Sequence, residues 1–384
     1  MRRINFVLLA LVLIFTFNSC EKTPSGKPEY NRVVVLYMAA NNNLNSFAQQ
    51  NLDLLKDGFI PEENSKDILI VYKHLEGKDP RLVRLFKGRA GDIKEDVVSA
   101  YEDQNSANGD VLKAVLNRVY KIFPASEYGL ILWSHATGWL PEGYYDSSYN
   151  QAFMEDPYAH LVKSFGEDRG VEMEVKELKA SIPYKFSFIL FDCCLMGGVE
   201  TIYELKDLTD YIIASPTEIL AYGFPYSEIM RPLFKPKANL EEVCKLFYDY
   251  YNNESGINRS ATIALYKTAE LSELAKASNT IFNNNREKIQ LLNMSKIQPY
   301  FRMNKHWFWD IDNLMREIAS PSEYDQFNLA LKKVVKAKWS TSYFLDIDIN
   351  SFSGLSTYIQ NPENNFLDSF YRDFDWNSAS EMIK

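Results

Sequence analysis

Two apolar runs in the chain each end at a side chain that can take part in nucleophilic catalysis. The run LILWSH, residues 130–135, ends at His135, and the run FILFDCC, residues 188–194, ends at the pair Cys193 and Cys194. Such runs are typical of buried strands, and an open α/β sheet builds its active site beyond the carboxyl ends of its strands. The pattern predicts that His135 and a cysteine lie close together at one edge of a sheet.

A cysteine and a histidine in this arrangement can form a hydrolase site. A free thiol, with a pKa of about 8.5, is mostly protonated at neutral pH, and a neighbouring imidazole raises the thiolate fraction or accepts the proton. Cys194 is followed by LMGGVE, which indicates a turn straight into a helix whose N-terminus would also favour a thiolate. A structural interpretation stays open, because buried cysteines commonly act as small apolar side chains.

Composition and charge describe a large folded chain. Its 384 residues are 46% hydrophobic and 14% aromatic, which is enough for a large core. The net charge is -9 and the isoelectric point is near 5.2. Nucleic acids and anionic membrane surfaces attract clustered lysine and arginine, so we expect neither as a partner. A cationic substrate is electrostatically easier to bind.

The N-terminus predicts an export signal and a tether. A basic start and the apolar run 4–17 are typical of a secretory signal and are too short to span a membrane comfortably. The run ends at FNSC, which resembles a bacterial lipobox. We therefore expect residues 1–19 to be a signal peptide, Cys20 to be lipidated at the bacterial cell envelope, and residues 20–31 to be a flexible tether. An ordinary signal peptide cleaved nearby and an uncleaved anchor are the alternatives.

The remaining cysteines and the histidines indicate neither a disulfide framework nor a metal site. Three cysteines follow the tether, an odd number, and we expect free thiols. The histidines are scattered, with no cysteine or histidine partner within a helical turn, which argues against zinc. We expect His74 and His160 at the surface and His306 in C-terminal packing.

Strands alternate with helices over the first 226 residues, which predicts a mostly parallel sheet covered by helices on both faces. The expected strands are 32–38, 67–72, 82–86 (a hairpin or edge), 130–135, 188–194 and 210–214, and the expected helices are 44–56, 108–123, 171–182 and 197–206. The polar stretch 139–170 is expected to be a functional or mobile loop. Beyond residue 226 the pattern predicts helices at 240–251, 269–284 and 321–338, a strand at 261–266 that completes the sheet, and short strand-like pieces at 343–359.

The residues at the two strand ends resemble the clostripain family of cysteine peptidases, relatives of caspases, gingipains and legumain. The family pattern is a strand ending in NHGxGW and a later one ending in DACLMG, which stand here as SHATGW at 134–139 and DCCLMG at 192–197. The resemblance covers about residues 32–226, with a weaker match at SGLSTY, 353–358. It implies a caspase-like catalytic core at 32–226, followed at 227–384 by completion of the sheet and a mainly helical subdomain.

The resemblance also implies roles for individual residues. Cys194 would be the nucleophile, because Cys193 takes the place of the family's alanine, and His135 would protonate the leaving amine. The backbone N–H groups of Ala136 and Cys194 are candidates for an oxyanion hole. Ala136 replaces a glycine of the family, which restricts the backbone there.

Substrate recognition is expected around Asp192, which is either a structural carboxylate or the floor of a pocket for a basic side chain. The resemblance favours the pocket, and bidentate geometry would favour arginine over lysine. Glu218 could supply a second acid, and Tyr222 could line the pocket wall. Trp139 is either a cleft residue or a core aromatic.

These observations predict a lipid-anchored cysteine endopeptidase that cleaves proteins or peptides after arginine or lysine through a thioester. Close relatives cut themselves between the histidine and cysteine segments after a basic residue, here Lys163 or Arg169. We expect no cofactor: relatives use calcium, but no carboxylate cluster supports it in this chain. A catalytically silent binding lipoprotein of the same fold and a transpeptidase or amide transferase are the alternatives.

Overall fold

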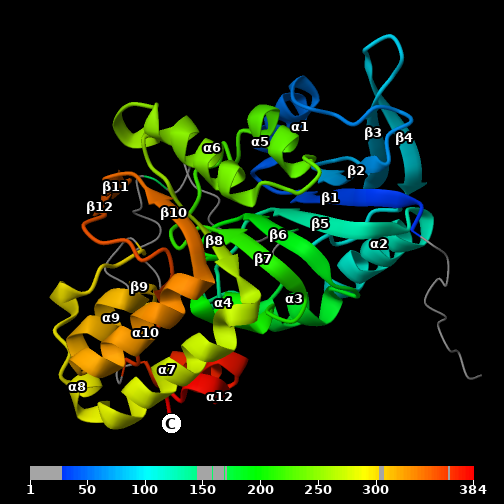
Figure 1. Cartoon of the computed structure of the whole chain (residues 1–384). Helices are drawn as coiled ribbons and strands as arrows, with labels where there is room; N and C mark the ends of the chain where they lie inside the picture. The colour runs from blue at the N-terminus through cyan, green and yellow to red at the C-terminus, as the bar shows by residue number, and fades with distance from the viewer. Residues whose placement is uncertain (1–27, 145–157, 159–167, 169–170, 302–306, 362–363) are drawn as a thin grey trace, which may run out of the picture.

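The computed structural model describes residues 28–144, 158, 168, 171–301, 307–361 and 364–384. Its centre is a nine-stranded mixed sheet with the order β10-β8-β7-β6-β5-β1-β2-β3-β4 (Figure 1). The parallel strands are β1 (Tyr30–Ala40), β2 (Asp67–Leu75), β5 (Ala125–Trp133), β6 (Phe186–Asp192) and β7 (Thr209–Ala214). The antiparallel strands at the two edges are β3 (Arg81–Lys87), β4 (Ile93–Ala100), β8 (Thr262–Lys267) and β10 (Val335–Ser340).

The central strands are buried along most of their length, because helices cover both faces of the sheet. In β1, every residue from Val33 to Ala40 is buried, as expected for a strand that contacts protein on both sides. One face carries α1 (Asn45–Asp57), α5 (Tyr226–Leu233) and α6 (Leu240–Asn252), and the other carries α2 (Gly109–Ile122), α3 (Val175–Ser181) and α4 (Val199–Glu204) (Figure 1). The predicted α/β class with helices on both faces is confirmed.

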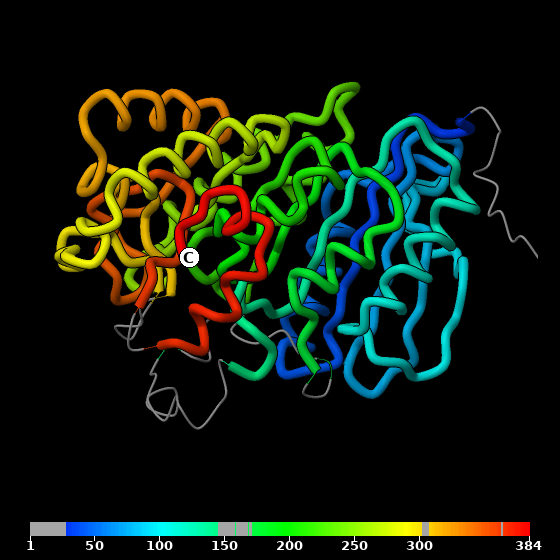
Figure 2. Tube along the Cα trace, turned by 90° about the horizontal axis from the view of Figure 1, so that it is seen from below, coloured from blue at the N-terminus to red at the C-terminus, as the bar shows by residue number. Residues whose placement is uncertain are grey.

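The C-terminal third packs against the β10 end of the sheet. Its helices are α7 (Leu271–Asn284), α8 (Arg286–Gln290), α9 (Ile311–Ile318), α10 (Pro321–Val334), α11 (Asn365–Arg372) and α12 (Asp375–Ser380), with 3-10 turns η3 (Gly256–Asn258), η4 (Thr268–Glu270) and η5 (Met294–Lys296). Two small antiparallel pairs join β9 (Trp309–Asp310) to β13 (Ser356–Thr357) and β11 (Tyr343–Phe344) to β12 (Ile347–Asp348). Figure 2 shows the red C-terminal segment where this part meets the central strands, and α12 contacts both α7 and α4.

Two expected helices have different bounds. The helix predicted at 321–338 ends at Val334, and its last residues form β10, which pairs antiparallel with β8. The open edge of β8 supplies backbone partners there, and this tertiary pairing overrides the local pattern. The helix predicted at 171–182 begins only at Val175, because Val171 forms a bridge with Asp168. The sequence pattern did not predict β4, α5, α9, α11 or α12.

Within the described part of the chain, no helix combines the length and apolar character needed to cross a bilayer.

Candidate active site

His135 and the two cysteines follow the ends of neighbouring strands. Trp133, the last residue of β5, pairs with Asp192, the last residue of β6. Because the two strands are parallel and in register, the residues after them leave the sheet at the same edge. The expected juxtaposition of the two strand ends is therefore present in the fold.

His135 is held by the turn that follows β1. Its side chain is buried, 5% exposed, and its Nε2 atom lies 2.7 Å from Oδ1 of Asn43. Because an amide oxygen only accepts hydrogen bonds, Nε2 is the donor, and Nδ1 is the basic nitrogen of the neutral ring. The preceding residue is fixed too, since Ser134 Oγ donates to the carbonyl oxygen of Ala39 at 2.9 Å. Asn43 was not singled out in the sequence, and only its place after the first strand could have indicated it.

The thiols of the two cysteines have different surroundings. Cys193 Sγ donates to the carbonyl oxygen of Leu132 at 3.1 Å, on the neighbouring strand β5. Cys194 Sγ is fully buried and accepts a hydrogen bond from the backbone N–H of Ile219 at 3.1 Å. The same Sγ lies 3.6 Å from the carbonyl oxygen of Ile219, to which the thiol donates, so both polar backbone groups of Ile219 hold the sulfur.

The turn after Cys194 is longer than the sequence predicts. α4 begins at Val199, so Cys194 lies outside its first turn and the expected helix-dipole effect on the thiol does not apply. Leu195 has a positive φ of 62°, and its N–H donates to the carbonyl oxygen of Thr217 at 2.9 Å. The cysteine turn is thus fastened to the same segment that contacts the Cys194 thiol.

Gly138 lets the histidine loop approach the cysteine turn. Its φ is +66°, and a Cβ atom there would lie 2.7 Å from the carbonyl oxygen of Leu195. A side chain at this position would therefore push the loop after His135 and the cysteine turn apart.

A mostly apolar cavity of about 100 Å³ adjoins His135. Ala136, Cys193 and Met196 contribute to its wall, together with Met173 ahead of α3. Cys194 does not belong to the lining that the described residues form. The cavity therefore opens on the side of His135 and Cys193, whereas the Cys194 thiol faces Ile219.

The structure places Asp192 in a buried, hydrogen-bonded setting. Its Oδ2 atom accepts from the Tyr226 hydroxyl at 3.0 Å and from the backbone N–H of Phe224 at 3.3 Å. Burial, reinforced by the nearby Asp192 carboxylate, raises the pKa of Tyr226 well above its ordinary value, so the phenol stays a donor. These contacts correspond to the structural interpretation of Asp192.

The other expected pocket residues lie in the segment after β7. Glu218 is buried next to Ile219, whereas Tyr222 is 40% exposed and packs edge-on against Phe47 of α1. Asn51 of α1 donates to the carbonyl oxygen of Tyr222 at 2.8 Å. Tyr222 is therefore the one of these two side chains that solvent reaches.

Trp139 lies in the core and outside the cavity lining. It is 1% exposed, its ring centroid is 4.9 Å from that of Tyr358 and 5.3 Å from that of Tyr371, and its Nε1 donates to the carbonyl oxygen of Trp307. The interpretation as a cleft residue is wrong in this structure, because aromatic side chains of the C-terminal part enclose the indole.

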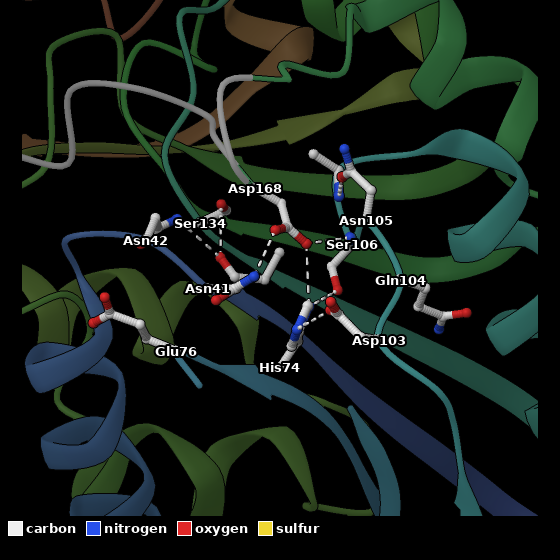
Figure 3. A network of polar contacts seen from close by, with 12 residues as sticks. Asn41, Asn42, His74, Glu76, Asp103, Gln104, Asn105, Ser106, Ser134 and Asp168 are labelled. Carbon is white, nitrogen blue, oxygen red and sulfur yellow. Dashed lines mark hydrogen bonds and ion pairs between the residues drawn. The ribbon is translucent and has the colours of Figure 1, made fainter. Parts of the chain in front are cut away.

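His74 is a correction as well, since it is buried and not at the surface. It is paired with Ala39 across the sheet and joins a network with Ser106 and Asp168 (Figure 3). The feature of the sequence that could have indicated its burial is the apolar Leu75, which extends β2 beyond His74. Within the described residues, no group of three or more histidine, cysteine or acidic side chains could hold a metal ion.

Several expected sites lie outside the described residues: the lipidation residue Cys20, the candidate self-cleavage residues Lys163 and Arg169, and the histidines His160 and His306.

Comparison with known proteins identifies relatives of this architecture. The inactive zymogen of a C11 protease from Parabacteroides distasonis shares 32% identity, with a TM-score of 0.79 over 92% of this chain and 99% of that one. A secreted C11 cysteine protease from Bacteroides thetaiotaomicron, in complex with an irreversible peptide inhibitor, shares 28% identity, with a TM-score of 0.79 over 91% of this chain and 99% of that one. No curated protein matches the chain.

The model of the clostripain family, Peptidase_C11, matches residues 36–380, nearly the whole of the described fold. The matched region contains both catalytic-loop motifs and the C-terminal part. The chain is a cysteine peptidase of the clostripain family.

Proposed function

We propose that this peptidase cleaves polypeptides after arginine or lysine with Cys194 as nucleophile and His135 as acid and base. The in-register ends of β5 and β6 are the observation that carries the proposal, because they bring the two loops to one edge of the sheet. Because Cys193 and Cys194 are adjacent, the family pattern decides which of them is the proposed nucleophile, and it favours Cys194.

The reaction follows from these groups. The thiol proton passes to Nδ1 of His135 while Cys194 Sγ bonds to the scissile carbonyl carbon, whose oxygen becomes negative. Backbone N–H groups at Ala136 and Cys194 are the proposed donors to that oxygen. The C–N bond then breaks, the imidazolium gives its proton to the leaving amine, and water hydrolyses the thioester with His135 as base.

The burial of the Cys194 thiol implies a movement before catalysis. Cys194 Sγ is fully buried and hydrogen-bonded to Ile219, so a substrate carbonyl reaches it only when the segment 217–222 shifts. One relative with this fold is an inactive zymogen and another is in complex with an irreversible peptide inhibitor.

The preference for a basic residue rests on Asp192 and Glu218, two buried carboxylates next to Cys193 and Ile219 in the sequence. A buried carboxylate pairs well with a cationic side chain. A clostripain from Bacteroides thetaiotaomicron, 29% identical with a TM-score of 0.51, is in complex with the peptide inhibitor BTN-VLTK-AOMK, whose VLTK sequence ends in lysine. Asp192 and Tyr226 would separate for a guanidinium or ammonium to bind.

A positional-scanning peptide library tests the proposal, with the Cys194→Ala protein as the blank. Cleavage confined to bonds after arginine or lysine supports it, and cleavage elsewhere contradicts the specificity. The silent binding protein is the second candidate, favoured by the burial of the Cys194 thiol. Labelling by a basic peptidyl electrophile, lost in Cys194→Ala, separates enzyme from binder, and products formed with an added amine reveal a transferase.

We also propose that the enzyme is anchored in the cell envelope by a lipid on Cys20 and needs no metal. Export is supported by the secreted relative. Metabolic labelling with a fatty acid should mark the wild type and not Cys20→Ala. Chelator treatment should leave the activity unchanged, and restoration by calcium after a loss would contradict the metal-free proposal.

A further inference from the structure

A buried histidine–carboxylate pair joins three separate parts of the chain (Figure 3). His74 is the penultimate residue of β2, Ser106 precedes α2, and Asp168 lies between β5 and β6 in the sequence. His74 Nδ1 is 2.7 Å from Ser106 Oγ and 3.1 Å from Asp168 Oδ2. The backbone N–H of Ser106 donates to the same Asp168 oxygen at 2.5 Å.

Asp168 is the centre of this network. Its side chain is 0% exposed, and its second oxygen, Oδ1, accepts from Nδ2 of Asn41 at 2.9 Å. Burial alone would raise its pKa, but the hydrogen bonds from His74, Ser106 and Asn41 outweigh burial and lower the pKa. The carboxylate is therefore ionised at neutral pH, with its hydrogen bonds supplied by three different segments.

The network reaches the proposed catalytic histidine through one short turn. Asn41 stands two residues before Asn43, whose amide oxygen accepts from His135. The carbonyl oxygen of Ala39, at the start of this turn, accepts from Ser134, the neighbour of His135. The turn 39–43 is thus held by Asp168 on one side and by the histidine loop on the other.

We propose that Asp168 is a positioning residue: by fixing Asn41 it holds the turn that orients His135. This proposal rests on the proposed function of His135. Ser106, whose N–H donates to Asp168, lines the cavity that adjoins His135. A single buried carboxylate is therefore connected both to the turn that orients His135 and to the wall of the cavity.

The kinetic test compares three variants with the wild type on a peptide substrate. Asp168→Asn removes the charge at nearly constant size, and Asn41→Ala removes only the connection to the turn. Both should lower kcat roughly tenfold with little change in KM, the size of effect typical for residues that act through others. The double variant should lose no more than the worse single variant, because both changes break the same connection.

The matched control is Asp103→Asn. Asp103 is the other carboxylate near His74, 3.7 Å from Nε2, but its side chain is 58% exposed, and exposed pairs contribute little. Its kcat should stay within twofold of the wild type. An equal loss in the control, or an unchanged kcat in Asp168→Asn and Asn41→Ala, overturns the proposal.

A second measurement does not need peptidase activity. In the Cys194→Ala background, hydrogen exchange reports on the backbone amides of Leu44 and Asn45, which donate to the side chain and the carbonyl oxygen of Asn42. Asp168→Asn and Asn41→Ala should speed this exchange and Asp103→Asn should not. Unchanged exchange overturns the positioning role even if the wild type is an active peptidase. If exchange is faster but the wild type cleaves no peptide, only the proposed function is refuted. If Asp168→Asn does not fold, Asn41→Ala carries both tests.

Discussion

His135 Nε2 lies 2.7 Å from the Oδ1 atom of Asn43, so a side chain on the turn after β1 selects the tautomer of the proposed acid and base. Asn43→Ala should lower kcat roughly fivefold, the value of about one hydrogen bond.

Asn43→Asp keeps the acceptor and adds a negative charge that stabilises the imidazolium. The pKa of His135 should rise, and because the neutral imidazole is the proposed base, the acid limb of the pH–rate profile should move to higher pH by roughly one unit. A profile identical to that of the wild type in both Asn43 variants would show that the contact has no role in catalysis.

The two adjacent cysteines should behave differently. Cys194→Ala and His135→Ala should abolish peptide cleavage, and Cys193→Ala should keep most of it, because the Cys193 thiol donates to the Leu132 carbonyl oxygen and is replaceable there. Cleavage rates and circular dichroism of the purified variants measure activity and folding. A well-folded Cys193→Ala protein as inactive as Cys194→Ala would overturn the assignment of the nucleophile.

Asp192 should decide the preference for a basic residue. Asp192→Asn should lower kcat/KM for arginine substrates by roughly a hundredfold or more, about 2.7 kcal/mol, because the desolvated cation loses its partner. Tyr226→Phe removes only the hydroxyl that donates to Asp192 and should keep the preference for a basic residue. Full activity of Asp192→Asn on arginine substrates would place the pocket floor elsewhere.

Self-cleavage is expected at a basic residue between the two catalytic strands. Purified wild type should convert with time into two fragments that meet at Lys163 or Arg169, and Cys194→Ala should stay intact. Mass spectrometry of the fragments identifies the bond, and Lys163→Ala and Arg169→Ala tested singly confirm it. A fully active enzyme that remains one intact chain would contradict this prediction.

The capping box of α10 should make stability depend on acid. Glu323 accepts hydrogen bonds from Asn284 and from both the N–H and hydroxyl of Ser320, which lower its pKa to about 2. Because the folded pKa is below the ordinary value of 4.5, the stabilisation is complete above about pH 4.5 and disappears as the pH falls towards 2.

Glu323→Ala should therefore lower the free energy of unfolding by about 1 kcal/mol at pH 7. The difference from the wild type should shrink as the pH is lowered, in denaturant titrations repeated from pH 7 to pH 3. Asp325→Ala, an exposed position one residue beyond Tyr324 in the same helix, is the control and should change little. A pH-independent difference for Glu323→Ala would contradict the assignment.

Much of the architecture could be predicted because its signals are local. β1, β2, β5 and β6 each contain an uninterrupted apolar stretch of at least four residues. Helices such as α2 and α6 have both a periodic apolar face and an asparagine N-cap. The motifs around His135 and Cys194 identified the family. Gly138 belongs to the first motif, and its positive φ and close approach to Leu195 exclude a side chain there. Apart from that approach, these features depend on residues close together in the chain.

The rest depended on partners far away in the sequence. Val335–Ser340 became a strand because β8 offered an edge, and Trp139 became a core residue because Tyr358 and Tyr371 enclose it. The contact of Cys194 with Ile219, and the burial of His74 against Asp168, involve residues 25 and 94 positions apart (219 − 194 and 168 − 74).

The sequence by itself determined the alternating α/β pattern, the family and the two loops that carry the chemistry, since local apolar runs and short motifs encode them. Only the tertiary structure decided which cysteine lines the cavity, which nitrogen of His135 donates to Asn43, and how Asp168 is connected to the turn at Asn41. Side-chain direction and burial are set by packing between distant segments, and no local pattern encodes them.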